Sequence, residues 1–129
     1  MLLLLLLHIG PQPTSEPRQL SSAQAASLVE LAVRRQLELI HARGNFSLDP
    51  MAIEPDRRFL SYEALGAFER NGAGSAVIGN YAVNLKTAEV WDLSRCKPVE
   101  FLQLKALQKR LSLTLKLRAP TSRLPANCP

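Results

Sequence analysis

Two runs of alternating apolar and polar residues, separated by a glycine-rich segment, constrain this chain most. They cover residues 59–70 and 75–83, and the sequence Asn-Gly-Ala-Gly at 71–74 lies between them. Alternation with a period of two is typical of a strand with one buried face. Glycine and asparagine tolerate the positive φ angles of a tight turn. The pattern predicts a hairpin with these residues on one face: Leu60, Tyr62, Ala64, Gly66, Phe68, Val77, Gly79, Tyr81 and Val83.

A third strand is predicted over residues 88–93, after a short turn at 84–87. Asn84 begins that turn, and its side-chain oxygen is placed to accept the backbone N–H two residues ahead. Val90 and Trp91 then restore strand character. Residues 59–93 therefore predict a β-meander.

The string Tyr81-Ala-Val-Asn84-Leu-Lys-Thr87-Ala-Glu-Val90-Trp91 resembles the strand-turn-strand of small bacterial cystatin-like and NTF2-like domains, PepSY-type modules among them. The resemblance covers about the length of the meander. It implies a helix packed on an antiparallel sheet, and at fold level a binding, inhibitory, immunity or accessory role. Ala88 stands where the pattern usually has glycine, so a left-handed backbone there costs about 1 kcal/mol.

The first helix is predicted over residues 21–43. Ser21 and Gln24 have the spacing of a capping box, and Gly44 is suited to the C-cap. Two ion pairs with i,i+4 spacing, Glu30 with Arg34 and Arg34 with Glu38, are expected on the outer face. Apolar residues at spacings of three and four form the inner stripe: Ala26, Val29, Val33, Leu37 and Ile40.

The segments on either side of the meander are less regular. Residues 45–58 contain two prolines and have the composition of a loop that holds at most one short strand. A second helix is predicted from about Val99 to Leu111. From Leu111 to Arg118 leucines alternate with polar residues, which favours a terminal strand or an irregular tail. The spacing of Leu107, Leu111 and Leu115 also fits a helix.

These patterns predict an α+β fold of the cystatin-like type. A long N-terminal helix packs on an antiparallel meander of three to four strands, with a second helix near the C-terminus. Residues 1–20 are interpreted as a leader or weak signal segment and linker, residues 21–118 as a single α+β domain, and residues 119–129, with three prolines, as a disordered tail.

The apolar run at residues 2–7 is too short to span a membrane as a helix. It resembles the core of an export signal, although no lysine or arginine precedes it. We expect a periplasmic or secreted protein, and the alternative is a cytoplasmic protein with a disordered leader. The leader contains His8, one of two histidines.

Positive charge is concentrated near the C-terminus. Residues 97–129 contain seven basic residues and one acidic residue, whereas residues 1–96 contain nine basic and ten acidic residues. An intracellular protein that binds nucleic acid through this segment is therefore an alternative function. Phe101 is the only aromatic residue of the segment available for stacking on bases, so a protein partner is preferred.

Cys96 and Cys128 are the only cysteines, and in an exported chain they are a candidate disulfide. Two cysteines and two scattered histidines do not form a structural zinc site, so no metal and no cofactor is expected. His41, near the end of the first helix, is interpreted as a helix-terminal residue that complements the dipole. The sequence indicates no enzyme.

The function predicted from the sequence is a small secreted or periplasmic binding or accessory protein without catalytic activity. Its partner is expected to be another macromolecule, bound through Tyr62, Tyr81 and Trp91 on an exposed sheet face. The alternative role for these aromatic residues is core packing. An enzyme with an NTF2-like cone would instead require a polar pocket formed by His41, Tyr62 and Glu63.

Overall fold

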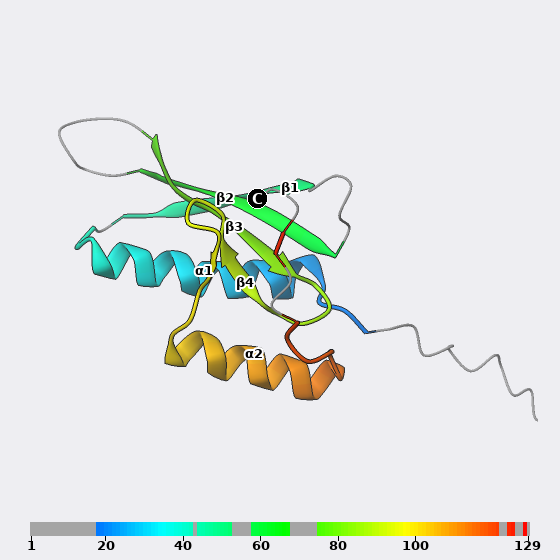
Figure 1. Ribbon diagram of the computed structural model, residues 1–129. Coiled ribbons are helices and arrows are strands. Elements are labelled where there is room, and N and C mark those ends of the chain that lie inside the picture. The colour runs from blue at the N-terminus through cyan, green and yellow to red at the C-terminus, as the bar shows by residue number, and fades with distance from the viewer. Residues whose placement is uncertain are drawn as a thin grey trace, which may run out of the picture.

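The computed structural model describes residues 18–42, 44–52, 58–67, 75–121, 124–125 and 128. Two helices, α1 (Ser22–Leu39) and α2 (Leu102–Leu115), share one core with an antiparallel sheet whose spatial order is the same as its chain order. Figure 1 shows α1 lying across the sheet and α2 lying next to α1, at the outer edge of the molecule. The five strands are β1 (Phe46–Ala52), β2 (Phe59–Ala67), β3 (Ser75–Asn84), β4 (Val90–Asp92) and β5 (Lys97–Pro98).

The predicted α+β class is confirmed, but the sheet has five strands instead of three to four. Strand β1 occupies part of the segment predicted as a loop, and it pairs with β2 so that Pro50 lies opposite Tyr62. A proline is tolerated there because β1 is an edge strand and one side of its backbone needs no partner. The turn predicted at residues 71–74, Phe68 and residues 1–17 lie outside the described residues.

The predicted alternation holds in β2 and in the second half of β3. Tyr62 lies opposite Tyr81 on the face that packs against α1. The register shifts between Ala64 and Leu65, so one residue of β3 is extra. Because an irregularity of this kind changes which face a side chain occupies, Val77 is 54% exposed instead of buried with its predicted neighbours.

Helix α1 begins as predicted and ends earlier than predicted. The side chain of Ser21 accepts the backbone N–H of Gln24, and the Gln24 side chain accepts the backbone N–H of Ser21, which completes the capping box. The C-cap is Ile40, and His41 adopts a left-handed conformation with φ 52°. The prediction that Gly44 ends the helix was wrong, because His41 already turns the chain.

Helix α2 continues to Leu115, so the predicted helix end near Leu111 and the predicted terminal strand were wrong, whereas residues 117–118 are irregular. Leu104 is fully buried, and other leucines at spacings of three and four pack against the same core: Leu107, Leu111 and Leu115. This helical stripe therefore prevails over the alternation of leucines with polar residues. Lys116 closes the helix in the left-handed region with φ 54°.

The turn between β3 and β4 has the predicted form. The side-chain oxygen of Asn84 accepts the backbone N–H of Lys86 at 3.0 Å, as expected for an Asx-turn. Ala88 has φ 66°, so the left-handed position that suits glycine is filled by alanine. Its side chain is fully buried in the main core.

The same turn binds segments from both ends of the domain. The backbone N–H of Leu20 donates to the carbonyl of Leu85 at 2.8 Å, and that of Arg118 donates to the carbonyl of Lys86 at 2.9 Å. The backbone N–H of Thr121 donates to the Glu89 side chain at 3.2 Å. This turn therefore holds together the segments that precede α1 and follow α2.

Part of the segment predicted as a disordered tail is packed against the domain. Pro125 is fully buried and Cys128 is 7% exposed. Cys128 is joined in a disulfide to Cys96, which lies in the turn between β4 and β5, and their Cα atoms are 5.6 Å apart. The bond closes a loop with a sequence separation of 32 residues.

Candidate partner-binding surface

The three aromatic residues predicted to bind a partner are buried. Tyr62, Tyr81 and Trp91 are 3%, 4% and 4% exposed. Tyr62 and Tyr81 belong to the core beneath α1, whereas Trp91 packs with Phe59 and Ala82 in a smaller cluster. The prediction of one exposed aromatic platform is therefore corrected to the alternative role of core packing. Since a sheet places alternate residues on opposite faces, strand parity separates Trp91 from the two tyrosines.

The chemistry of the two tyrosines fits a structural role. The Tyr62 hydroxyl donates a 2.9 Å hydrogen bond to the Ser22 carbonyl and so fixes the start of α1 to β2. Burial raises the pKa of Tyr62. Burial, reinforced by the nearby Asp92 carboxylate and opposed by Arg95, raises the pKa of Tyr81 to about 12. Both phenols are neutral at physiological pH.

The pocket required by the enzyme hypothesis does not form. His41 is exposed beyond the end of α1, and Tyr62 is buried under the same helix. Glu63 follows Tyr62 on the strand, so its side chain points to the opposite face of the sheet. Glu63 lies opposite Asn80 in the register. His41, Tyr62 and Glu63 therefore do not converge on one site.

The outer side of α2 is the most prominent unpartnered surface in the described part of the chain. The two most exposed large hydrophobic side chains there are Leu102, at 87%, and Leu113, at 72%. They are separated by eleven residues, which places them on the same side of the helix about 16 Å apart. Ala106 and Lys109 lie between them on the same side, and both are exposed. We refer to Leu102, Ala106, Lys109 and Leu113 as the α2 ridge.

A groove lies on each side of the α2 ridge. One groove, of about 560 Å³, lies between α2 and the β4–β5 region and is lined by Val90, Pro98 and Lys105 among others. The other, of about 550 Å³, lies between α1 and α2 and is lined by Leu31 and Arg110 among others. A protein that contacts the α2 ridge can therefore place side chains in the groove on either side of the helix.

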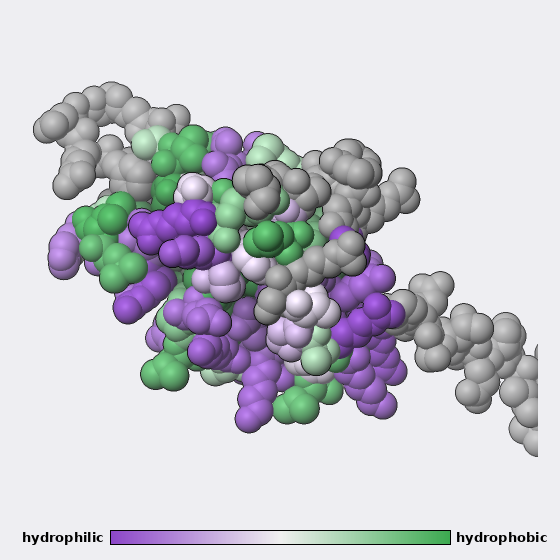
Figure 2. Space-filling view, in the orientation of Figure 1, coloured by the Kyte–Doolittle hydropathy of each residue, from purple (hydrophilic) through white to green (hydrophobic). Residues whose placement is uncertain are grey.

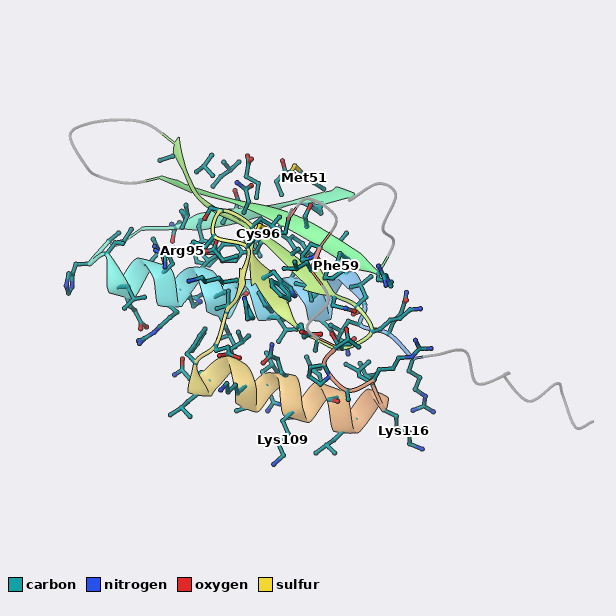
Figure 3. The ribbon with its side chains drawn as sticks, viewed as in Figure 1. Met51, Phe59, Arg95, Cys96, Lys109 and Lys116 are labelled. Carbon is teal, nitrogen blue, oxygen red and sulfur yellow. A yellow bond between two sulfur atoms is a disulfide. The ribbon has the colours of Figure 1, made fainter. Side chains whose placement is uncertain are left out.

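The charged side chains of α2 are all positive. Helix α2 and its C-cap contain four basic residues and no acidic residue, and all four are exposed: Lys105, Lys109, Arg110 and Lys116. Figure 3 shows Lys109 and Lys116 extending from α2 away from the sheet. In Figure 2, apolar green atoms stand among hydrophilic purple ones along the edge where α2 lies. The surface therefore combines cations with exposed leucine.

The described residues contain no group of three or more histidine, cysteine, aspartate and glutamate residues able to hold a metal ion. Within those residues, no helix is sufficiently long and apolar to cross a membrane.

The sequence contained a signal for the α2 ridge that the prediction did not use. Leu102, Ala106, Lys109 and Leu113 follow spacings of four, three and four, the spacing of one helical side. Ending the helix near Leu111 removed Leu113 from that side. The positive charge of residues 97–129 was recognised, but its combination with exposed leucine depends on the helix reaching Leu115.

No protein-family model matches the chain, and no curated protein is significantly similar to it in sequence. Among solved structures, the chain is similar to a chain of a type VI secretion system effector–immunity complex from Pseudomonas protegens. The two chains share 20% sequence identity with a TM-score of 0.60, over 78% of this chain and 80% of the other. At this identity the likeness shows a shared α+β fold.

Proposed function

We propose that this chain is a small exported protein without catalytic activity that binds another protein and blocks it, in the manner of an immunity protein. The observation that carries the proposal is the α2 ridge. Exposed leucines cost free energy in water, and two of them stand on one side of a single helix with cations between and beside them, which favours an interface with a partner. Helix α2 already buries its other side in the core, so the ridge is free for a second protein.

Two further observations support the proposal. The disulfide between Cys96 and Cys128 is of the kind that persists in oxidising compartments such as the periplasm, which favours export. The matched solved structure is a complex between a secreted effector and its immunity protein. A chain of this fold therefore occurs in a partner-bound state, which makes protein binding the first function to test.

The test is purification of the tagged full-length protein, after chemical crosslinking, from periplasmic, cytoplasmic and culture-medium fractions of its host. We expect an oxidised chain in the periplasm or medium, recovered in a stoichiometric complex with one other protein. The mass of the intact chain from a sample taken before crosslinking reports the disulfide, because oxidation removes two hydrogen atoms. A reduced cytoplasmic chain that elutes without a protein partner at its natural concentration would overturn the proposal.

A further inference from the structure

The exposed side of α2 has the pattern of one strand of a coiled coil. The α2 ridge has the spacing of alternating d and a positions, in the order Leu102, Ala106, Lys109, Leu113. In that register the flanking e and g positions of the helix include Lys105 and Arg110, both exposed. Those positions set the choice of partner helix in coiled coils through their charges. All charged residues that α2 contributes to this interface are positive, whereas the groove walls from other elements also contain Glu30, Glu89 and Glu100.

We infer that the α2 ridge docks an amphipathic helix of the partner protein, with an apolar stripe that meets Leu102 and Leu113 and with glutamates at its flanks. This inference rests on the proposed function and names the chemistry of its partner. Carboxylates on the partner helix would face Lys105, Lys109 and Arg110, and the two grooves would receive the side chains beside the stripe.

The start of α2 adds to the preference for acidic groups. Its N-cap is Phe101, which makes no side-chain capping hydrogen bond, and its first turn contains no acidic residue. The first backbone N–H groups of the helix therefore lack the side-chain oxygen that usually caps them, and they carry the positive end of the helix dipole. Leu102, which is 87% exposed, lies in this turn.

Other anionic partners fit this surface less well. Nucleic acid bound without sequence preference stacks its bases on aromatic side chains. The α2 ridge contains none, and Phe101 is only partly exposed, with Arg35 6.0 Å from its ring centre. A membrane-surface helix inserts a broad apolar face, but here Leu104, Leu107 and Leu111 pack inside the protein.

The probe is a synthetic helical peptide with leucine at a and d and glutamate at e and g, titrated into the full-length protein by NMR and calorimetry. We expect saturable binding, with the largest chemical-shift changes along the α2 ridge and the walls of its two grooves. A second peptide that has lysine in place of glutamate is expected not to bind. Failure of the glutamate peptide to bind, or shift changes located elsewhere, would overturn the inference.

Charge reversal gives the sharper version of the experiment. The double variant Lys105→Glu, Arg110→Glu should weaken binding of the glutamate peptide roughly tenfold or more and allow binding of the lysine peptide. The matched control is Arg18→Glu, which alters an exposed cation outside α2. Its affinity for either peptide should be unchanged. An unchanged preference in the double variant would overturn the inference.

The apolar part of the interface is tested by Leu102→Gln and Leu113→Gln, because leucine and glutamine have similar helix propensities. Each change should lower the affinity for the glutamate peptide several-fold. Leu39→Gln, at a residue 60% exposed on α1, should leave this affinity unchanged. Circular dichroism confirms that each variant is folded. Equal binding of single-stranded oligonucleotides or anionic phosphatidylglycerol vesicles, lost in the same variants, would contradict the choice of a protein helix.

The outcome separates this inference from the proposed function. If the natural complex is recovered from the host and survives the Lys105→Glu, Arg110→Glu change, the protein-binding function stands and the assignment of the α2 ridge falls. If no natural complex is recovered while the glutamate peptide still binds the ridge with the expected charge preference, the surface assignment stands and the proposed function falls.

Discussion

Gln108 on α2 donates a 2.9 Å hydrogen bond from its side-chain nitrogen to the carbonyl oxygen of Ala88, twenty residues earlier in the turn between β3 and β4. The carbonyl belongs to a residue whose side chain is fully buried. This hydrogen bond fixes the position of α2 relative to the turn between β3 and β4. Gln108 also lines the groove formed by α2 and β4.

Replacement of Gln108 by methionine should therefore lower stability. Gln108→Met preserves size and helix propensity but leaves the Ala88 carbonyl without its donor, and we expect a loss of about 1 to 2 kcal/mol in the free energy of unfolding. Urea denaturation followed by the fluorescence of Trp91, the single tryptophan, measures it. Gln103→Met, at an exposed position on the same helix, is the control and should have little effect.

The end of α1 offers a stabilising substitution. His41 has φ 52°, and its backbone N–H donates to the Glu38 carbonyl at 3.2 Å while that of Ala42 donates to the Leu37 carbonyl at 3.0 Å. This is the hydrogen-bond pattern of a Schellman motif, whose left-handed position favours glycine. His41→Gly should raise the free energy of unfolding by about 0.5 to 1 kcal/mol. His41→Ala retains the steric cost and should give no gain; equal gains would contradict this explanation.

Removal of the disulfide should destabilise the domain. In the chain-entropy model, a loop of the observed 32-residue separation contributes about 3 to 4 kcal/mol. The Cys96→Ser, Cys128→Ser double variant should lose stability on that scale in urea denaturation. Wild-type protein treated with dithiothreitol should show the same midpoint as the variant. A midpoint that does not respond to dithiothreitol would contradict a disulfide in the purified protein.

Stability should also fall at alkaline pH. The native pKa of Tyr81 is raised to about 12 from an ordinary value of 10.0, so the folded state retains a proton that the unfolded state releases. The stabilisation is fully present below pH 10 and decreases as the pH rises from about 10 to 12. Absorbance of phenolate at 295 nm follows the ionisation. Tyr81→Phe should flatten the pH dependence of the urea midpoint in that range.

The regular part of the fold was predictable because local signals agree with it. The capping box of Ser21 and Gln24, the Asx-turn of Asn84, and the pairing of two alternating strands all depend on residues close in sequence. Ala88 also adopts the left-handed conformation that the turn pattern requires, with φ 66°. Here sequence spacing determines the geometry directly.

The remaining features depend on tertiary contacts. Strand β1 contains Pro50, which argues against a central strand but not against an edge. The irregularity at Ala64 and Leu65 exposes Val77, and alternation within one strand does not reveal it. The final turn of α2 depends on the packing of Leu111 and Leu115 against the main core. The local sequence does not specify this packing, because its leucine spacing fits both a helix and a strand. Because the predicted helix ended near Leu111, the α2 ridge, which includes Leu113, was not predicted either.

The contacts of the β3–β4 turn also have a consequence for biosynthesis. Leu85 and Lys86 offer neighbouring carbonyls, one to Leu20 before α1 and one to Arg118 after α2. A chain made from its N-terminus cannot complete this junction until nearly all of the domain has emerged. Until then it remains open to the chaperones, translocases and proteases that act on unfinished polypeptides. Leu20 and Arg118 therefore lie side by side at this turn, although 98 positions separate them in the sequence.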